Sequence, residues 1–471
     1  MSVWHKCAWI GLWLGGIALS AALLVLALPP SGFGFLGWIC WVPAMVGCHR
    51  RGVAIGFVTG IGVCLIAAAL AATGLPYAER RDEGDPGWIY VGFAIFGLVA
   101  GFLLAVIASA KGPINWQRGL VWAAWAVLAE AALLIYLPAH LALTQWNNGF
   151  ALIVASLGGI WMVSFLVWAV NIFLAEVLTE RRYGLAAAVA LPFLVFQPLS
   201  TLIPPETGPL PIAMIQTEAA DEQALSALNR KAGELGAELA VWPELSGMGL
   251  APGGKTDALV KLATQPGQPP FVTSYPDASR PKPFNTASVF SVTGESGRYR
   301  KRKPFAAEQA IHQAGDQAVA VEALGARAGL NICFDTCFPN VMRDTARLPD
   351  VNLILLTTLD PPTPHGVIQA IHASYTPFRS AELGVPIIRA EATAWSMATD
   401  HRGLVIARLG LEKDSILIAK VSPQSRKPVA LYVGDGFLLV CAGLAVWGMI
   451  SRFRVPHPPT PSPSEWRGGA G

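Results

Sequence analysis

The stretch that decides the fold is Asn331-Ile332-Cys333-Phe334-Asp335-Thr336-Cys337-Phe338-Pro339. It completes the short apolar run Ala328–Cys333, and a continuous apolar run of this length indicates a buried strand. A cysteine at a strand end can project into a cleft. Two other stretches also carry polar residues at or near strand ends: Val241-Trp242-Pro243-Glu244 and Tyr299-Arg300-Lys301-Arg302-Lys303-Pro304-Phe305. We therefore expect Glu244 and Lys301 to converge on Cys333.

These three residue types suit attack on a carbonyl carbon. A thiol with an ordinary pKa near 8.5 is a weak nucleophile until it loses its proton. A nearby carboxylate can accept that proton. A fixed ammonium favours the thiolate and then stabilises the oxyanion of a tetrahedral intermediate, which is worth about 3–4 kcal/mol for one good donor. The trio predicts acyl transfer through a thioester.

Composition indicates a membrane protein. Of the 471 residues, 53% are hydrophobic and 14% are charged, whereas a soluble domain carries about 25% charged residues. The net charge is +3, and no basic cluster suited to phosphates is present, so nucleic acid is not expected as a partner. Five of the seven cysteines lie in or beside apolar stretches, which excludes a disulfide scaffold.

A membrane-spanning helix needs about 20 mainly apolar residues. Seven candidates precede residue 204, and the second is short enough to be re-entrant. An eighth candidate follows a long polar region. The eight segments are Ala8–Leu28, Phe33–Cys48, Val53–Gly74, Trp88–Ala110, Gly119–Leu137, Phe150–Leu178, Tyr183–Ile203 and Leu431–Ile450.

The orientation follows from lysine and arginine, which are retained in cytoplasmic loops. With the N-terminus inside, the outer loops hold only Arg80 and Arg81, beside four acidic residues. The inner loops hold Lys6, Arg50, Arg51, Lys111, Arg118, Arg181, Arg182, Arg452 and Arg454. We therefore expect a transmembrane domain over 1–203, an extracytoplasmic catalytic domain over 204–428, a C-terminal transmembrane helix over 429–452 and a disordered cytoplasmic tail over 453–471.

The long polar region has the pattern of a layered α/β domain. Its predicted helices are Asp221–Leu235 and Val367–Leu383. Its predicted strands are Pro211–Gln216, Ala237–Trp242, Pro270–Tyr275, Thr286–Val292, Ala328–Cys333, Val351–Thr357, Pro386–Arg389, Gly403–Arg408 and Ser415–Val421.

The order Trp-Pro-Glu, Tyr-x-Lys and Ile-Cys-Phe-Asp, followed by Phe-Pro, resembles the nitrilase (carbon–nitrogen hydrolase) superfamily. With membrane spans on both sides, the chain resembles the apolipoprotein N-acyltransferase family over about residues 25–450. Further stretches carry the same resemblance: Leu28–Phe33, Gly158–Phe165 with Asn171, His372, Arg379–Pro386 with Arg389, and Tyr432 with Gly434-Asp435.

The resemblance implies a membrane helical bundle joined to a four-layer αββα sandwich on the outer face of a bacterial inner membrane. It implies Glu244 as general base, Lys301 as oxyanion stabiliser and Cys333 as nucleophile. Cys333 would take an acyl chain from a phospholipid and pass it to the N-terminal amine of a diacylglyceryl-cysteine lipoprotein. Trp242, Phe334, Asp335 and Glu308 are the expected substrate-binding residues. No cofactor is implied.

The chain also departs from that family. The family usually has His-Leu-Val-Pro-Phe-Gly-Glu after its lysine, where this chain has Arg302-Lys303-Pro304-Phe305-Ala306-Ala307-Glu308. The place of Glu308 is therefore open, and Lys303 competes with Lys301 for the lysine role, although the spacing from Tyr299 favours Lys301. After the strand Val351–Thr357 the usual Ser-Asn-Asp-Ala-Trp-Phe is replaced by Thr357-Thr358-Leu359-Asp360-Pro361, so the acceptor substrate is open too.

Each residue also has a structural interpretation. Cys333 alone would be a buried core thiol, and Lys301 alone part of a solvated basic run. Cys337 is expected to pack or to line the pocket wall, and Asp335 either touches the site or caps the following helix. Glu130 and Asn171, inside predicted spans, are either functional or hydrogen-bond between helices. The histidines show no metal-ligand spacing, so no metal site is expected.

Two other functions compete with lipoprotein N-acylation. One is a membrane-anchored carbon–nitrogen hydrolase (an amidase) or an acyltransferase with another acceptor; an amidase admits water to the thioester, which an acyltransferase must exclude. The other is a transporter with an accessory domain, against which the apolar segments show neither an internal repeat nor paired broken helices.

Overall fold

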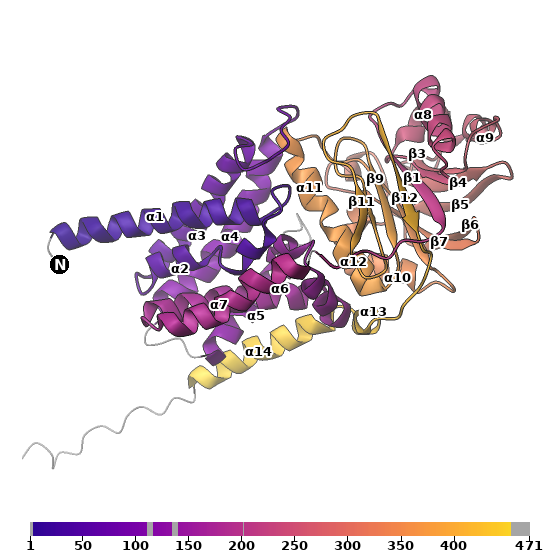
Figure 1. Cartoon of the computed structure of the whole chain (residues 1–471). Helices are drawn as coiled ribbons and strands as arrows, with labels where there is room; N and C mark the ends of the chain where they lie inside the picture. The colour runs from indigo at the N-terminus through magenta and orange to yellow at the C-terminus, as the bar shows by residue number, and fades with distance from the viewer. Residues whose placement is uncertain (1–2, 111–115, 134–139, 201, 454–471) are drawn as a thin grey trace, which may run out of the picture.

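The computed structural model describes residues 3–110, 116–133, 140–200 and 202–453. Figure 1 shows two parts side by side: a bundle of long helices that carries the N-terminus, and an α/β sandwich with two sheets. The predicted tail beyond residue 453, the inner-loop residue Lys111 and the predicted span end at 134–137 lie outside the described residues.

The helical part has a helix in each predicted apolar segment, although not all have the length of a membrane span. The helix of the eighth segment begins at Gly436 rather than at Leu431, which belongs to the short helix α13 (Val429–Val433). Among the described residues, α1, α3, α4 and α6 are long and apolar enough to cross a membrane. The total of eight spans therefore stays a prediction. The helices are α1 (Val3–Ala27), α2 (Val42–Cys48), α3 (Val53–Ala72), α4 (Gly87–Ser109), α5 (Trp116–Leu133), α6 (Gly149–Thr179), α7 (Tyr183–Ser200) and α14 (Gly436–Phe453).

The predicted second segment is broken rather than continuous. It forms the 3₁₀ turn η1 (Gly34–Trp38) and then the short helix α2. The buried amide of Asn171 holds the break, since its Nδ2 donates to the Gly37 carbonyl at 2.9 Å and its Oδ1 accepts from the Trp41 N–H at 2.8 Å. Backbone groups freed at a break inside an apolar bundle need such partners, so Asn171 has the interhelical hydrogen-bonding role.

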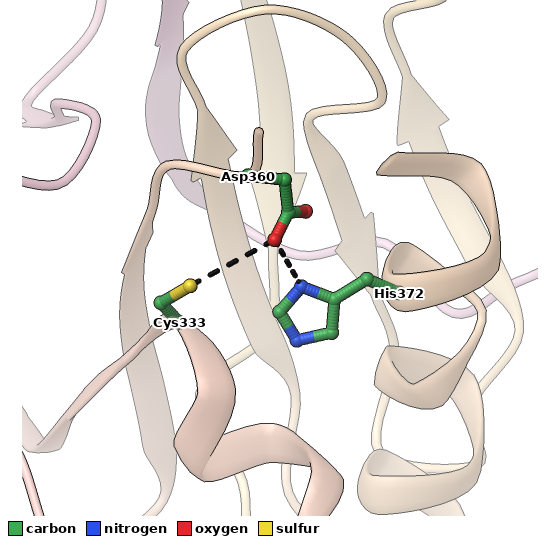
Figure 2. Close-up of side chains that lie close together, drawn as sticks. All are labelled: Cys333, Asp360 and His372. Carbon is green, nitrogen blue, oxygen red and sulfur yellow. Dashed lines mark hydrogen bonds and ion pairs between the residues drawn. The ribbon is translucent and has the colours of Figure 1, made fainter. Parts of the chain in front are cut away.

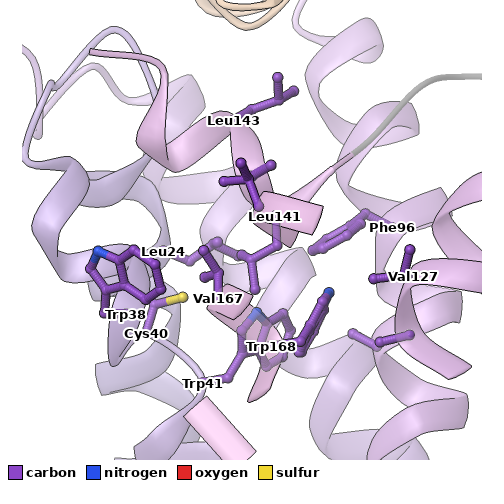
Figure 3. Packing of buried hydrophobic residues seen from close by; sticks show 14 of the residues in the cluster. Leu24, Trp38, Cys40, Trp41, Phe96, Val127, Leu141, Leu143, Val167 and Trp168 are labelled. Atoms are coloured by element: carbon purple, nitrogen blue, oxygen red, sulfur yellow. The ribbon is translucent and has the colours of Figure 1, made fainter. Parts of the chain in front are cut away.

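Aromatic side chains fill the centre of the helical part (Figure 3). The rings of Trp41 and Trp168 stack with centroids 5.6 Å apart, and Leu24, Leu141 and Val167 pack around them. Glu130 is buried beside this cluster, where its carboxylate accepts from the Trp168 indole, the Ser164 hydroxyl and the Leu141 N–H. Large apolar side chains such as Leu12 and Phe102 point outward and are exposed, which suits a lipid-facing surface.

Twelve strands of the sandwich form two six-stranded sheets. One has the order β12-β1-β2-β3-β4-β5 and the other the order β11-β10-β9-β8-β7-β6. The strands are β1 (Leu210–Gln216), β2 (Leu239–Val241), β3 (Phe271–Pro276), β4 (Asn285–Ser291), β5 (Gly294–Arg300), β6 (Val319–Ala323), β7 (Ala326–Ile332), β8 (Leu353–Thr358), β9 (Ile387–Glu391), β10 (Met397–Thr399), β11 (Val405–Arg408) and β12 (Ser415–Val421).

Helices cover the outer faces of both sheets, which gives the predicted four-layer αββα order. Side chains such as Met214 and Leu330 pack between the sheets. Helices α8 (Glu222–Glu234) and α9 (Asp257–Ala263) cover the first sheet, and α10 (Pro339–Ala346) and α12 (Tyr375–Leu383) cover the second. The segment predicted as one helix over Val367–Leu383 is two, α11 (Val367–Ala373) and α12. Both lie between the sheets and the membrane-type helices (Figure 1).

The loop between α3 and α4 also ties the two parts together. Arg81 donates from its guanidinium to the carbonyls of Leu411 and Thr393 at 3.1 and 2.9 Å. Its backbone N–H donates to the His365 ring at 3.2 Å. Asp85 donates its N–H to the Pro362 carbonyl at 3.0 Å. The sandwich loop that follows β8 is therefore held by the membrane-type part.

Candidate active site

Three strand ends bring the predicted trio together. Glu244 follows β2 by three residues, Lys301 directly follows β5, and Cys333 directly follows β7. The Lys301 ammonium donates to Glu244 Oε1 at 2.8 Å, and both side chains are almost fully buried. The Leu359 peptide links the other two members, because its N–H donates to Glu244 Oε2 at 3.0 Å and its carbonyl accepts from Cys333 Sγ at 3.7 Å.

The backbone at Cys333 has a left-handed conformation, with φ of 46°. This region is strained for residues other than glycine, and it is kept only where the surroundings over-determine it. Asp335 provides that constraint, since its carboxylate accepts from the Ile332 N–H at 3.1 Å and the Lys303 N–H at 2.9 Å. The sharp turn carries the sulfur out of the strand and toward a cavity.

Glu308 joins the site despite the altered spacing of its segment. Its Oε2 lies 2.5 Å from the Lys301 ammonium and accepts the Phe305 N–H at 2.8 Å. Asn285, at the start of β4, donates to both carboxylates, at 2.6 Å to Glu244 and 3.4 Å to Glu308. Lys303, the alternative lysine, lies elsewhere, with its ammonium over the Phe338 ring.

The charges at the site act on one another. Burial and the Glu308 charge raise the pKa of Glu244 to about 7, against the opposing effect of Lys301. Burial alone would lower the pKa of Lys301, but Cys333, Glu244 and Glu308 together raise it well above its ordinary value. Burial and the Glu244 charge raise the pKa of the Cys333 thiol, which Lys301 opposes. Lys301 therefore stays charged, whereas Glu244 can accept or release a proton near neutral pH.

A cavity of about 440 Å³ opens at the sulfur, between the sandwich and the membrane-type helices. Its polar end carries Lys301, Glu308 and Cys333. The rest of its wall is mostly apolar and comes from both parts of the molecule, including Leu24, Trp88, Phe93, Phe96, Leu141, Leu143, Phe305, Phe334, Ile368 and Ile371. Such a cavity accommodates an apolar chain whose polar end lies at the trio.

The expected substrate-binding residues separate into two groups. Phe334 and Glu308 line the cavity. Trp242 instead lies on the opposite face of the first sheet, where it stacks on Phe271 with centroids 4.1 Å apart and donates to Asn229 at 2.9 Å. Asp335 is also fully buried, and it accepts the Tyr299 hydroxyl at 2.7 Å. Packing and turn formation account for these two side chains, so neither has the contact that substrate binding would require.

A third carboxylate, that of Asp360, also lies close to the sulfur (Figure 2). Its Oδ1 is 3.8 Å from Cys333 Sγ and 2.7 Å from His372 Nδ1, and its Oδ2 accepts from Arg389 at 2.8 Å. The pKa of Asp360 is lowered to about 2, because His372 and Arg389 outweigh the effect of burial. His372 lies 39 residues after Cys333, so no local pattern in the sequence identifies it as a partner of that cysteine.

The sulfur, carboxylate and imidazole of Cys333, Asp360 and His372 lie within 4.8 Å of one another and are ligand types that Zn²⁺ accepts. However, Asp360 and His372 already bond directly to each other, and the Arg389 guanidinium lies 3.4 Å from the same imidazole nitrogen. A fixed cation in that place opposes a second one, so the donor set fits a hydrogen-bonded network better than a metal site. Cys337 is buried and unpaired.

Comparisons with known proteins found similarity to a family model, to curated proteins and to solved structures. Residues 210–430 match the family model described as carbon–nitrogen hydrolase. The chain is 27% identical to an apolipoprotein N-acyltransferase of Geobacter metallireducens, over 91% of this chain and 93% of that protein. It is 29% identical to one of Chlamydia trachomatis, over 27% of this chain and 24% of that protein. An amidase from Nesterenkonia sp. is 22% identical, with a TM-score of 0.42 over 51% of this chain and 99% of that chain.

Proposed function

From the premise that this membrane protein is a homologue of apolipoprotein N-acyltransferase with a carbon–nitrogen hydrolase domain, we propose that it N-acylates lipoproteins. The acyl donor is a phospholipid. The acceptor is the N-terminal amine of a lipoprotein's diacylglyceryl-cysteine. Glu244, Lys301 and Cys333 carry the chemistry through a thioester on the sulfur.

The observation that carries the proposal is the position of the trio at one end of an apolar cavity shared with membrane-type helices. Lys301 lines that cavity together with Cys333, and it is held on Glu244 at 2.8 Å. A soluble amide or nitrile gains little from an apolar wall contributed by α1 and α4. A lipid acyl chain gains about 0.8 kcal/mol for each CH₂ that it buries.

The first half-reaction forms the thioester. Glu244 accepts the Cys333 thiol proton, and the thiolate attacks the ester carbonyl carbon of the phospholipid. The Lys301 ammonium stabilises the oxyanion of the tetrahedral intermediate. When the intermediate collapses, the C–O bond to the glycerol breaks and Glu244 returns its proton to the leaving alkoxide. The products are an acyl-Cys333 thioester and a lysophospholipid.

The second half-reaction forms the amide. The acceptor's amine attacks the thioester carbonyl, and Glu244 takes a proton from the attacking nitrogen. Collapse of the second intermediate breaks the C–S bond, and the sulfur recovers its proton from Glu244. The two half-reactions together return the trio to its starting state, so no cofactor is needed. An apolar cavity wall also keeps water from the thioester, which separates a transferase from a hydrolase.

We also propose the domain organisation that the sequence predicts: membrane-spanning residues 1–203 and 429–452, a catalytic domain over 204–428 in the periplasm, and a disordered cytoplasmic tail over 453–471. The distribution of lysine and arginine supports this orientation across a bacterial inner membrane. Two lipid-bearing substrates would then enter the cavity sideways from the bilayer.

The altered loop after β8 keeps an amidase or another acyl acceptor as the alternative. Two assays separate these functions: complementation of a bacterial strain depleted of its own N-acyltransferase, and incubation with labelled phospholipid plus a diacylglyceryl lipopeptide. We expect growth to be restored and label to appear as an amide on the lipopeptide. Rapid release of free fatty acid without lipopeptide acylation would instead identify a hydrolase.

A further inference from the structure

The loop that follows β8 contacts the nucleophile and the general base at once. Leu359 donates its N–H to Glu244 Oε2 and accepts from Cys333 Sγ at its carbonyl. The next residue, Asp360, is a further acceptor near the sulfur, at 3.8 Å. The position of this loop therefore sets both the orientation of Glu244 and that of the thiol.

Three residues hold Asp360 in place, and all three belong to the second sheet or to the helices beside it. His372 on α11 meets its Oδ1 at 2.7 Å, and Arg389 on β9 donates to its Oδ2 at 2.8 Å. The Asp360 N–H donates to Glu391 Oε1 at 3.2 Å, and Glu391 also accepts from Arg389. Burial and the Asp360 charge raise the pKa of Glu391 to about 8, so near neutral pH one guanidinium faces one ionised carboxylate.

Resting on the proposed role of Cys333 as nucleophile, we propose that Asp360 is a second catalytic carboxylate, which holds the Cys333 thiol protonated until substrate arrives. His372 is a positioning residue that acts through Asp360 by aiming Oδ1 at the sulfur. The charged or titratable groups around the sulfur are then divided by role. Glu244 exchanges the proton, Lys301 and Glu308 face the oxyanion side, and Asp360 with His372, Arg389 and Glu391 faces the resting thiol.

The chemistry supports this division. A carboxylate beside a thiol accepts S–H and opposes the thiolate, and the Asp360 charge does raise the pKa of Cys333. Alkylating and oxidising agents attack the thiolate rather than the thiol. A thiol kept protonated at the end of an accessible cavity is protected from these agents. It ionises once the substrate carbonyl is bound, when Glu244 accepts its proton and Lys301 stabilises the oxyanion.

The test measures alkylation of Cys333 by iodoacetamide as a function of pH, read by mass spectrometry of the peptide that contains it. Asp360→Asn removes the charge and keeps the shape. We expect its alkylation profile to move to lower pH, with a rate at pH 8 at least about threefold above that of the parent. Asp316→Asn, at an exposed carboxylate in a surface loop, is the matched control and should keep the parent profile.

Substitutions of His372 give a second test in which Asp360 is unchanged. His372→Ala should move the profile in the same direction, whereas His372→Asn should restore it, because the asparagine amide donates from nearly the position of Nδ1. Acyl transfer should fall about tenfold in kcat for Asp360→Asn, with a smaller change in KM for phospholipid. Alkylation does not require acyl transfer, so this test stands even if the proposed acceptor is wrong.

Unchanged alkylation profiles for folded Asp360→Asn and for His372→Ala would overturn the proposal. If Asp360→Asn does not fold, the two histidine variants decide. A shift of the parent's own profile on addition of EDTA would also overturn it, because the cluster would then hold a thiophilic cation rather than a hydrogen-bonded thiol.

Discussion

At the residue scale, the trio could be predicted because each member carries a distinctive neighbour, and Glu244 and Cys333 also come at or just after a recognisable strand. Glu244 follows Trp-Pro, Lys301 follows Tyr299 by two residues, and Cys333 ends an apolar run. Asn285 and Asp360 could not be predicted as their partners. Asparagine at a strand start is common, and the contact of Asp360 with the sulfur depends on a loop whose path is set by residues from two other elements.

A comparison of Lys301 with Lys303 tests the assignment of Lys301 as oxyanion stabiliser. Lys301→Met should lower the rate of acyl transfer by about 10²–10³-fold, because the oxyanion loses its charged donor. Lys303→Met should retain most of the activity, since that ammonium lies over the Phe338 ring instead. Thermal unfolding checks that both variants fold. Equal losses in the two variants would contradict the role of Lys301.

The pH dependence of thioester formation tests the role of Glu244. A general base must be ionised, and burial raises the pKa of Glu244 to about 7, so the rate should rise with pH through about 7. Glu308 raises that pKa, and Glu308→Gln should therefore move the acidic limb to lower pH. Single-turnover rates with labelled phospholipid between pH 5 and 9 measure both. A limb centred near pH 4.5, or a shift to higher pH in the variant, would contradict the assignment.

At the scale of elements, periodicity predicted nine of the twelve strands and the long helices but missed β5, β6 and the three-residue strand β10. β5 has the sequence Gly-Glu-Ser-Gly-Arg-Tyr-Arg and lies half-buried at the edge of its sheet, so its residues show no apolar alternation. β6 also lies at an edge. The break between η1 and α2 depends on Asn171 from a distant helix, which no local pattern reveals.

Helix α6 has a kink, and a backbone group at this kink bonds to the sandwich. Gly159 has φ of 73° and ψ of −179° inside this helix, a conformation that is essentially restricted to glycine. The Ile160 N–H that follows the kink donates to Glu382 Oε1 of α12 at 2.6 Å, and Arg379 pairs with the same carboxylate. A buried glutamate of the sandwich thus caps the second half of a membrane-type helix.

Gly159→Ala should therefore destabilise the protein by about 1–3 kcal/mol. The added Cβ would lie 3.3 Å from Glu382 Oε1 in a backbone conformation that alanine avoids. Thermal unfolding in detergent measures the effect, and Gly15→Ala is a matched control in α1, where a Cβ meets nothing within 4 Å. An unchanged melting temperature for Gly159→Ala would show that the kink is not required.

At the scale of the whole molecule, composition and loop charges predicted a membrane protein with an α/β domain, and both parts are present. The number of spans does not follow from the sequence, because a segment of 16 residues, Phe33–Cys48, can cross the membrane, re-enter it or form a broken helix. The docking of the two parts could not be predicted from the sequence. It depends on single contacts such as those of Arg81 with carbonyls more than 300 residues away.

The orientation can be measured by adding one exposed cysteine at a time in a Cys7→Ser background, in which the remaining six cysteines are buried. Asp316→Cys lies in the catalytic domain and Arg181→Cys in a predicted inner loop, and both positions are exposed. In intact spheroplasts, a membrane-impermeant maleimide should label the first and not the second, because loops rich in arginine stay in the cytoplasm. The opposite labelling would place the catalytic domain on the cytoplasmic face.

The central claim is that a lipid acyl chain is carried on the Cys333 sulfur, and the covalent intermediate tests it most directly. After incubation with phospholipid in the absence of an acceptor, mass spectrometry of the whole protein should show the mass of one acyl chain. Hydroxylamine should remove it, and the adduct should map to the peptide that contains Cys333. Cys333→Ala should lack the adduct and Cys337→Ala should keep it. An adduct that persists in Cys333→Ala, or no adduct in the parent while acyl transfer proceeds, would contradict the account.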